Sequence, residues 1–155
     1  MNIEKQDFET QTYIYVQGKA RITDPTAIAA AMGAAFAEIF GFIQKVGITP
    51  LSAPITVYTK IPGTNMKFRS GFFVTPEDAK KATGDVKADS IPAGSALHAQ
   101  HVGPYMDLKQ THGAIWGYAK SHSLKSSMPV WEIYIDDPDK APADKLRTEV
   151  YHTVT

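Results

Sequence analysis

The pattern of apolar and polar residues predicts a strand followed by a long helix at the start of the chain. A β-rich segment covers residues 13–22. Asp24-Pro25 is a typical helix start, because the carboxylate can accept from free N–H groups and proline needs no donor at the first helical position. Apolar residues then recur at i, i+3 and i+4 spacing through residues 25–46, and Gly47 is expected to end the helix.

The remaining pattern predicts two more strands in the first half and the same element order in the second. Residues 55–58 and 67–74 are expected to form strands joined by a Pro62-Gly63 turn. A polar, lysine-rich stretch, residues 76–87, separates the halves. The expected elements of the second half are a strand at 95–102, a helix at 105–122, and strands at 130–135 and 147–154.

Residues of the two halves also match at one constant offset of 76 positions. Glu38–Phe42 aligns with Ala114–Tyr118, and Val57-Tyr58 aligns with Ile133-Tyr134. An internal duplication is favoured over chance alignment, because the two halves share the order of their elements, the constant offset and the succession of helix, glycine and strand.

The predicted fold is therefore α+β, a pseudo-two-fold duplication of a strand–helix–strand–strand unit. Residues 1–155 are expected to form a single domain, with repeats at about 8–75 and 86–155. Antiparallel sheets would form a central cleft, with two long helices packed on them. Interfaces between repeats are common places for small-molecule sites, so this cleft is the candidate site.

Alternation along the strand around Glu132 predicts which side chains face the cleft. Glu132 and Tyr134 share one face, while Trp131 and its alternate neighbours form an apolar face suited to packing under a helix. Tyr58 occupies the position of the first half that is equivalent to Tyr134. The predicted cleft is thus aromatic, with one carboxylate at its middle.

Three further residues are expected to line the cleft. Phe73 and Tyr15 would enter it from two other strands, provided that their apolar neighbours face the helix, and Gly71 would leave room for a ligand. Tyr105 either lines the cleft mouth or anchors the second helix. A register slip of one residue would reverse every one of these strand assignments.

The environment of Glu132 has several readings, because burying an unpaired carboxylate costs several kcal/mol. It could lie in an edge strand facing water, or pair with Arg69 or Arg147. It could instead be a desolvated carboxylate that binds a cationic ligand, or a general acid or base. The sequence leaves these readings open, because the register between the halves is not visible in it.

Composition and charge narrow the class of partner. The chain is 43% apolar and 21% charged, as is ordinary for a globular protein, and sixteen basic residues balance sixteen acidic ones. No basic face for nucleic acid and no basic amphipathic helix for a membrane surface is evident. The longest apolar run, residues 28–43, contains Glu38 and is shorter than the ~20 residues of a membrane span. The N-terminus has no apolar stretch of a secretory signal, so a cytoplasmic location is expected.

Metal, thiol and cofactor chemistry have little support in the sequence. There are no cysteines, which excludes disulfides and thiolate ligands. The five histidines show no HxxxH or HExxH spacing, so no metal site is predicted. No cofactor is expected.

Four motifs in order carry a family resemblance: Ile91–Gly94, His101–Tyr105, Val130–Pro138 and Leu146–Tyr151. The sequence resembles the GyrI-like family, the effector-binding domain also found at the C-terminus of AraC-type and MerR-type multidrug regulators. The resemblance covers nearly the whole chain and is most specific in the second half.

The resemblance implies a fold of two strand–helix–strand–strand units and a function in binding lipophilic, often cationic compounds. Family members have a glutamate in an aromatic cleft, a role that would fall on Glu132. One branch hydrolyses strained cyclopropane-bearing toxins with a cleft glutamate and aromatic residues, here Glu132 and Tyr134. Only a dozen residues precede the first predicted strand, so a stand-alone form is expected. The related SOUL haem proteins share the fold, but no residue here carries over as their ligand.

The residues and the family resemblance together suggest three candidate functions. The leading one is a stand-alone module that binds or sequesters a lipophilic, cationic or aromatic small molecule. The second is a hydrolase, which would consume its ligand where a binding module returns it unchanged. The third is an inhibitor that contacts a protein partner, although a net charge of zero disfavours mimicry of DNA.

Overall fold

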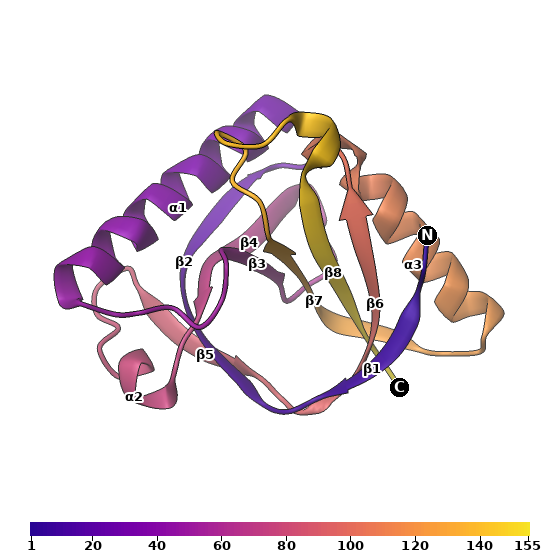
Figure 1. Cartoon of the computed structure of the whole chain (residues 1–155), viewed down its shortest axis with the longest axis horizontal. Coiled ribbons are helices and arrows are strands. Elements are labelled where there is room, and N and C mark those ends of the chain that lie inside the picture. The colour runs from indigo at the N-terminus through magenta and orange to yellow at the C-terminus, as the bar shows by residue number, and fades with distance from the viewer.

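The computed structural model describes all 155 residues and contains one eight-stranded antiparallel sheet with two main helices (Figure 1). The helices are α1 (Pro25–Val46) and α3 (Leu108–Ser121), with a short α2 (Pro76–Ala79) between them. The strands are β1 (Glu4–Phe8), β2 (Gln11–Arg21), β3 (Ile55–Tyr58), β4 (Asn65–Phe73), β5 (Lys87–Ile91), β6 (Gly94–Val102), β7 (Ser126–Tyr134) and β8 (Arg147–Val154).

Helix α1 begins and ends where the sequence predicts. The side chain of Asp24 accepts a hydrogen bond from the backbone N–H of Ala27 at 3.0 Å. Gly47 adopts a left-handed conformation with φ of 74° and donates its N–H to the carbonyl of Ile43. The helix buries one face on β2 and β4, and its most buried residues are Ala35, Ile39 and Ile43.

By length and composition alone, α1 also meets the requirements of a membrane-spanning helix. It has 22 residues, and its most apolar window has a mean hydropathy of 1.7. The expected run, residues 28–43, is shorter than a bilayer span, but the helix that contains it is long enough. The core helix of a soluble protein can pass the same test; in α1, 17% of the apolar window is buried, and the helix packs on β2 and β4.

The second helix is shorter than predicted. Residues Tyr105–Asp107 form a 3₁₀ turn, and α3 begins only at Leu108. Neither Pro104 nor Asp107 makes a side-chain capping bond at this end, whereas Asp24 caps α1. The start of α3 consequently lacks the stabilisation that a cap gives, about 0.5–2 kcal/mol.

Strands β1 and β5 were not predicted, because each is a mostly exposed edge strand without apolar alternation. β1 pairs with β6, and β5 pairs with β2, so each has a partner on one side only. The full strand order is β1-β6-β8-β7-β3-β4-β2-β5.

Strands β3 and β7 pair with each other at the centre of the sheet. Thr56 lies opposite Glu132, and Ile55 lies opposite Ile133. The order outward from this centre is β3-β4-β2 on one side and β7-β8-β6 on the other, with α1 on the first set and α3 on the second (Figure 1). Glu132 is therefore not on an edge strand, which excludes the reading that it faces water there.

The two faces of the sheet are both apolar, and the helices cover the face that carries Glu132. Paired residues share a face, and one row across the sheet on the helix side contains Val16, Ser70, Thr56, Glu132, Val150 and Ala99. The other face forms a separate cluster of buried residues, which includes Tyr13, Tyr15, Ile55, Val57, Phe73 and Trp131.

Two predictions about faces are consequently wrong. Trp131 and Val57 do not pack under a helix, and Tyr15 and Phe73 do not share a face with Glu132. The alternation within each strand was read correctly, with Ile14, Phe68 and Phe72 on the α1 side. The error arose because β3 and β7 are buried on both faces, so the period of two could not tell which face the helices cover.

Gly71 does not leave room for a ligand, as the sequence reading supposed. A Cβ atom at this position would lie 1.8 Å from the carbonyl oxygen of Ile14 on β2. The glycine instead allows β2 and β4 to approach closely.

We therefore expect Gly71→Ala to lower the free energy of unfolding by about 1–3 kcal/mol or more, because the strands must separate or shift. Gly113→Ala is the matched control: it lies on α3 with open space around it and should raise stability by about 0.5–1 kcal/mol. Urea denaturation followed by circular dichroism measures both. Equal stability of Gly71→Ala and the parent would contradict the close approach.

Candidate functional site

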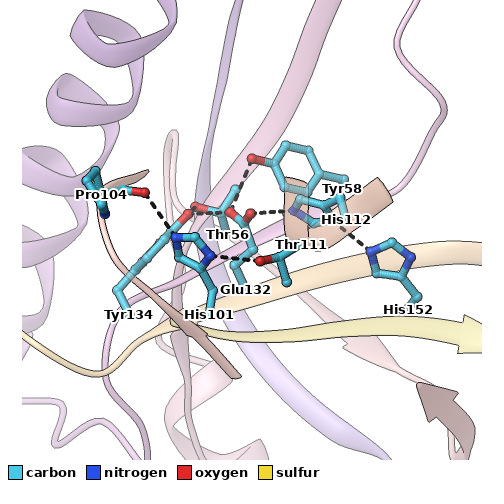
Figure 2. A network of polar contacts seen from close by, with 9 residues as sticks. All are labelled: Thr56, Tyr58, His101, Pro104, Thr111, His112, Glu132, Tyr134 and His152. Atoms are coloured by element: carbon cyan, nitrogen blue, oxygen red, sulfur yellow. Dashed lines mark hydrogen bonds and ion pairs between the residues drawn. The ribbon is translucent and has the colours of Figure 1, made fainter. Parts of the chain in front are cut away.

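Glu132 lies on β7 with only 3% of its surface exposed, and both of its oxygens are hydrogen-bonded (Figure 2). Oε1 accepts from the hydroxyl of Tyr134 at 2.7 Å and from that of Tyr58 at 3.4 Å. Oε2 lies 2.7 Å from Nε2 of His112 on α3. The Tyr134 hydroxyl also lies 2.9 Å from Oγ1 of Thr56. The carboxylate is thus held from the sheet on one oxygen and from a helix on the other.

The two tyrosines act as hydrogen-bond donors at this site. Burial raises the pKa of Tyr58 and of Tyr134 well above the ordinary value of 10.0, and the charge of Glu132 raises both further. Both hydroxyls consequently keep their protons at neutral pH and can donate them to Oε1 of Glu132.

His112 joins Glu132 to a second histidine. Its Nδ1 lies 2.7 Å from Nε2 of His152 on β8, and the two rings stack with centroids 5.0 Å apart. Trp116, one turn further along α3, lies against both rings, at 5.8 Å from His112 and 4.9 Å from His152. Trp116 is 47% exposed, so it covers the histidines on the solvent side.

His152 is fully buried and neutral. Burial, with a smaller contribution from the neighbouring His112, lowers its pKa from 6.5 to about 3. Its Nδ1 has no hydrogen-bond partner within the protein.

Aromatic side chains from two other elements contact Tyr134. The ring of Phe36 on α1 meets it edge-on at 5.9 Å, and that of Tyr105 meets it at 5.4 Å from the turn before α3. Tyr105 is 37% exposed, so it both anchors this turn and reaches the surface. Among the six predicted site residues, Glu132, Tyr134, Tyr58 and Tyr105 lie together, and Tyr15 and Phe73 do not.

Neither arginine pairs with Glu132, so that alternative is wrong. Arg69 lies on the opposite face, where it donates to Asp89 at 2.6 Å and to the hydroxyl of Tyr13 at 2.8 Å. Arg147 pairs with Asp136 at 2.9 Å.

The partner that the sequence reading missed is the His112–His152 pair. His152 lies in the inward phase of β8, where Thr148, Val150, His152 and Val154 are all buried. The signal available in the sequence was His152 itself, a histidine at a position where the alternation of β8 predicts a buried apolar residue. His112 follows Leu108 by four residues, which places it beside the buried stripe of α3.

A cavity in another part of the molecule does not include Glu132. It has a volume of about 650 Å³ and opens at the edge of β2, where it is lined by Tyr15, Val16, Gln17, Glu38, Asp85, Lys87 and Ala88. The charged side chains of that lining are exposed or carry no buried hydrogen bonds, unlike the network at Glu132. The candidate site is therefore the Glu132 cluster, whose interior is filled by its own side chains.

The neutral state of His152 predicts a pH dependence of stability. Its folded pKa of about 3 lies below the ordinary 6.5, so the unfolded chain binds the proton more readily. The associated stability is complete above about pH 6.5 and is lost as the pH falls toward 3, with a slope of at most about 1.4 kcal/mol per pH unit.

Replacing the imidazole should remove this slope. We expect His152→Phe to show a weaker fall of unfolding free energy between pH 7 and pH 4 than the parent, measured by chemical denaturation at each pH. His122→Phe, at the exposed end of α3, is the control and should keep the parent slope. Parallel curves for all three proteins would contradict a buried neutral His152.

The fold recurs in solved proteins of low sequence identity. The crystal structure of the EcmrR C-terminal domain matches with a TM-score of 0.79 at 18% identity, over 99% of this chain and 97% of that chain. In the cryo-EM structure of an EcmrR–DNA complex the TM-score is 0.80 at 16% identity, and the match covers 99% of this chain but only 57% of the EcmrR chain.

Two further structures are similar. SAV2435, solved bound to tetraphenylphosphonium, matches with a TM-score of 0.67 at 11% identity, over 100% of this chain and 94% of that one. A hydrolase encoded by lin2189 from Listeria innocua matches with a TM-score of 0.64 at 18% identity, over 99% and 92%. At these identities the likeness shows the fold.

Family membership rests on the sequence itself. A search of curated proteins finds no match. Comparison with protein families matches residues 1–154 to the GyrI-like small molecule binding domain, which confirms the resemblance seen in the four motifs. The chain therefore belongs to the GyrI-like family of small-molecule-binding domains.

Proposed function

We propose that this protein binds lipophilic small molecules, cationic or aromatic, at Glu132, and that it sequesters or senses them. The observation that carries the proposal is the burial of an ionisable carboxylate whose Oε1 is held by two tyrosine hydroxyls from the sheet. Such an anchored carboxylate supplies a fixed negative charge in a poorly solvated place, where its attraction for a cation is stronger than in water.

The surrounding aromatic rings suit a ligand with spread-out positive charge. Phe36, Tyr105, Tyr134 and Trp116 come from α1, the turn before α3, β7 and α3. Each ring face that meets a cation adds about 0.5–2 kcal/mol. A lipophilic cation loses little hydration on entering, so both contributions can favour binding. Tetraphenylphosphonium, bound by the structurally similar SAV2435, has this chemistry.

We further infer that the two halves, residues 8–75 and 86–155, are repeats related by a pseudo-two-fold axis. The matching strand orders on either side of β3 and β7 support it. Thr56 and Glu132 are 76 residues apart and face each other across the central pair, so the axis would pass between them. Only one of these two equivalent positions holds a carboxylate, and the site would therefore accept a single positive charge.

Glu132→Gln tests the role of charge, because the amide keeps the volume of the side chain and removes its charge. We expect tetraphenylphosphonium binding to weaken by about tenfold or more, as a charge-assisted contact is worth more than about 1.5 kcal/mol. Binding of a neutral aromatic compound of similar size should change little. Isothermal titration calorimetry measures both.

Phe73→Leu is the control for this experiment. It lies in the cluster on the opposite face of the sheet, so it should lower stability without changing affinity. Equal loss of the cationic and the neutral ligand in Glu132→Gln would show that the carboxylate does not recognise charge.

A hydrolase is the second candidate, favoured by the direct contact of Glu132 with His112 at 2.7 Å. A carboxyl–imidazole pair can transfer a proton, and the fold is that of the Listeria innocua hydrolase. In such a reaction Glu132 would activate a strained ring, such as a cyclopropane, or position water, with the hydroxyl of Tyr134 assisting. Mass spectrometry of a cyclopropane-bearing compound incubated with the protein distinguishes the two, because only a hydrolase adds water to it.

A further inference from the structure

The two oxygens of Glu132 are held by different parts of the fold. Both donors to Oε1 belong to β3 and β7, the central pair of the sheet. Oε2 has a single protein partner, His112, and this residue belongs to α3. The N-terminal end of α3 has no side-chain cap. Oε2 is therefore the oxygen that a shift of the helix side can free.

The contacts of His112 fit an imidazolium. Its Nε2 lies 2.7 Å from Oε2 of Glu132 and its Nδ1 lies 2.7 Å from Nε2 of His152, so a ring with two N–H donors can bond to both. A buried carboxylate needs a cation beside it, and Arg69 and Arg147 are both paired elsewhere. The imidazolium satisfies that need, while His152 stays neutral.

We propose, resting on the binding function proposed above, that His112 is the built-in counter-ion of this site and that a cationic ligand binds by displacing it from Oε2. The carboxylate exchanges one cation for another, and His112 gives up one proton to solvent. Two positive charges beside one buried carboxylate would repel each other, so the imidazole cannot keep its proton once the ligand has arrived.

The geometry also indicates the side from which the ligand enters. His112 is covered by the ring of Trp116, which is half-exposed and lies four residues further along the same helix. Moving the His112 ring away from Glu132 requires Trp116 to move as well. The ligand then reaches Oε2 from the side that Trp116 covers, while Tyr58 and Tyr134 continue to hold Oε1.

Burial keeps the three tyrosines and the second histidine of the site from exchanging protons near neutral pH. The titratable groups that face this part of the site from the other elements are Tyr58, Tyr134, Tyr105, His152 and His101. Burial raises the pKa of the three tyrosines above the ordinary 10.0 and lowers that of His152 to about 3. The ring of His101 is bonded to Thr111 and to the carbonyl of Pro104, away from Glu132. The side chain of α1 that contacts the site is the uncharged ring of Phe36.

Calorimetric titration with tetraphenylphosphonium tests the exchange. The parent protein should release protons on binding, seen as a difference in heat between two buffers of different ionisation enthalpy, and its affinity should rise from pH 6 to pH 8. His112→Ala should release none, and should bind about tenfold or more tightly at pH 6 because no charge-assisted bond must be broken. His112→Phe keeps a ring against Trp116 and His152, and provides the same test if the alanine variant does not fold.

His122→Ala, a histidine at the exposed end of the same helix, is the matched control and should behave as the parent. Equal affinities and equal proton counts for the parent and both His112 variants would overturn the exchange and leave the binding function intact. Binding by the variants alone would support the exchange, with His112 fully blocking the site in the parent. Failure of every folded protein to bind any lipophilic cation would overturn the binding function, and the exchange with it.

Discussion

The burial of one carboxylate at the centre of the sheet is the constraint on which the rest of the site depends. An ionised group at 3% exposure is stable only if other groups replace its water. Here the replacements come from three different elements, with Tyr58 on β3, Tyr134 on β7 and His112 on α3. The network therefore ties the central strands to a helix, and it forms only when the two halves of the chain are assembled.

The site lies at the junction of two separate apolar cores. One core packs α1 against β2 and β4 and includes Tyr58 at its margin. The other packs α3 against β6 and β8 and includes Tyr134 at its margin. On the opposite face of the sheet a third cluster, with Ile55 and Val57 on β3 and Trp131 on β7, joins the two halves behind the site. The site therefore lies where the helix-side clusters of the two halves meet over a shared apolar layer.

The order of the main elements and the centre of the site could be predicted from the sequence, because the signals for them lie within a few residues of one another. Asp24, Gly47 and the spacing of apolar residues in α1 act within a few positions of one another, so they could be read directly. Period-two alternation likewise grouped Glu132 with Tyr134, and the repeat offset added Tyr58. Strands β1 and β5 were not predicted, because an exposed edge strand such as Lys87–Ile91 buries too few side chains to need an alternation of apolar and polar residues.

What the sequence could not supply was the choice of face and the identity of the counter-ion. Tyr15 and Phe73 were misplaced because the strands of this sheet are apolar on both sides, and only the packing of the helices distinguishes one side from the other. His112 lies 20 residues before Glu132 and reaches it through the packing of α3, a contact that no local pattern encodes. Both failures concern relations between elements, which depend on tertiary packing and not on sequence spacing.

A resident counter-ion also bears on how a small domain can accept many different ligands. A site shaped around one compound would leave a cavity when empty, and cavities destabilise the folded state roughly in proportion to their volume. Here Oε2 of Glu132 is already bonded to His112, and Trp116 packs against that histidine. The folded state is thereby maintained without the ligand, and selection of the ligand rests on charge and on aromatic contact. Shape then matters less than the ability to replace an imidazolium beside one buried carboxylate.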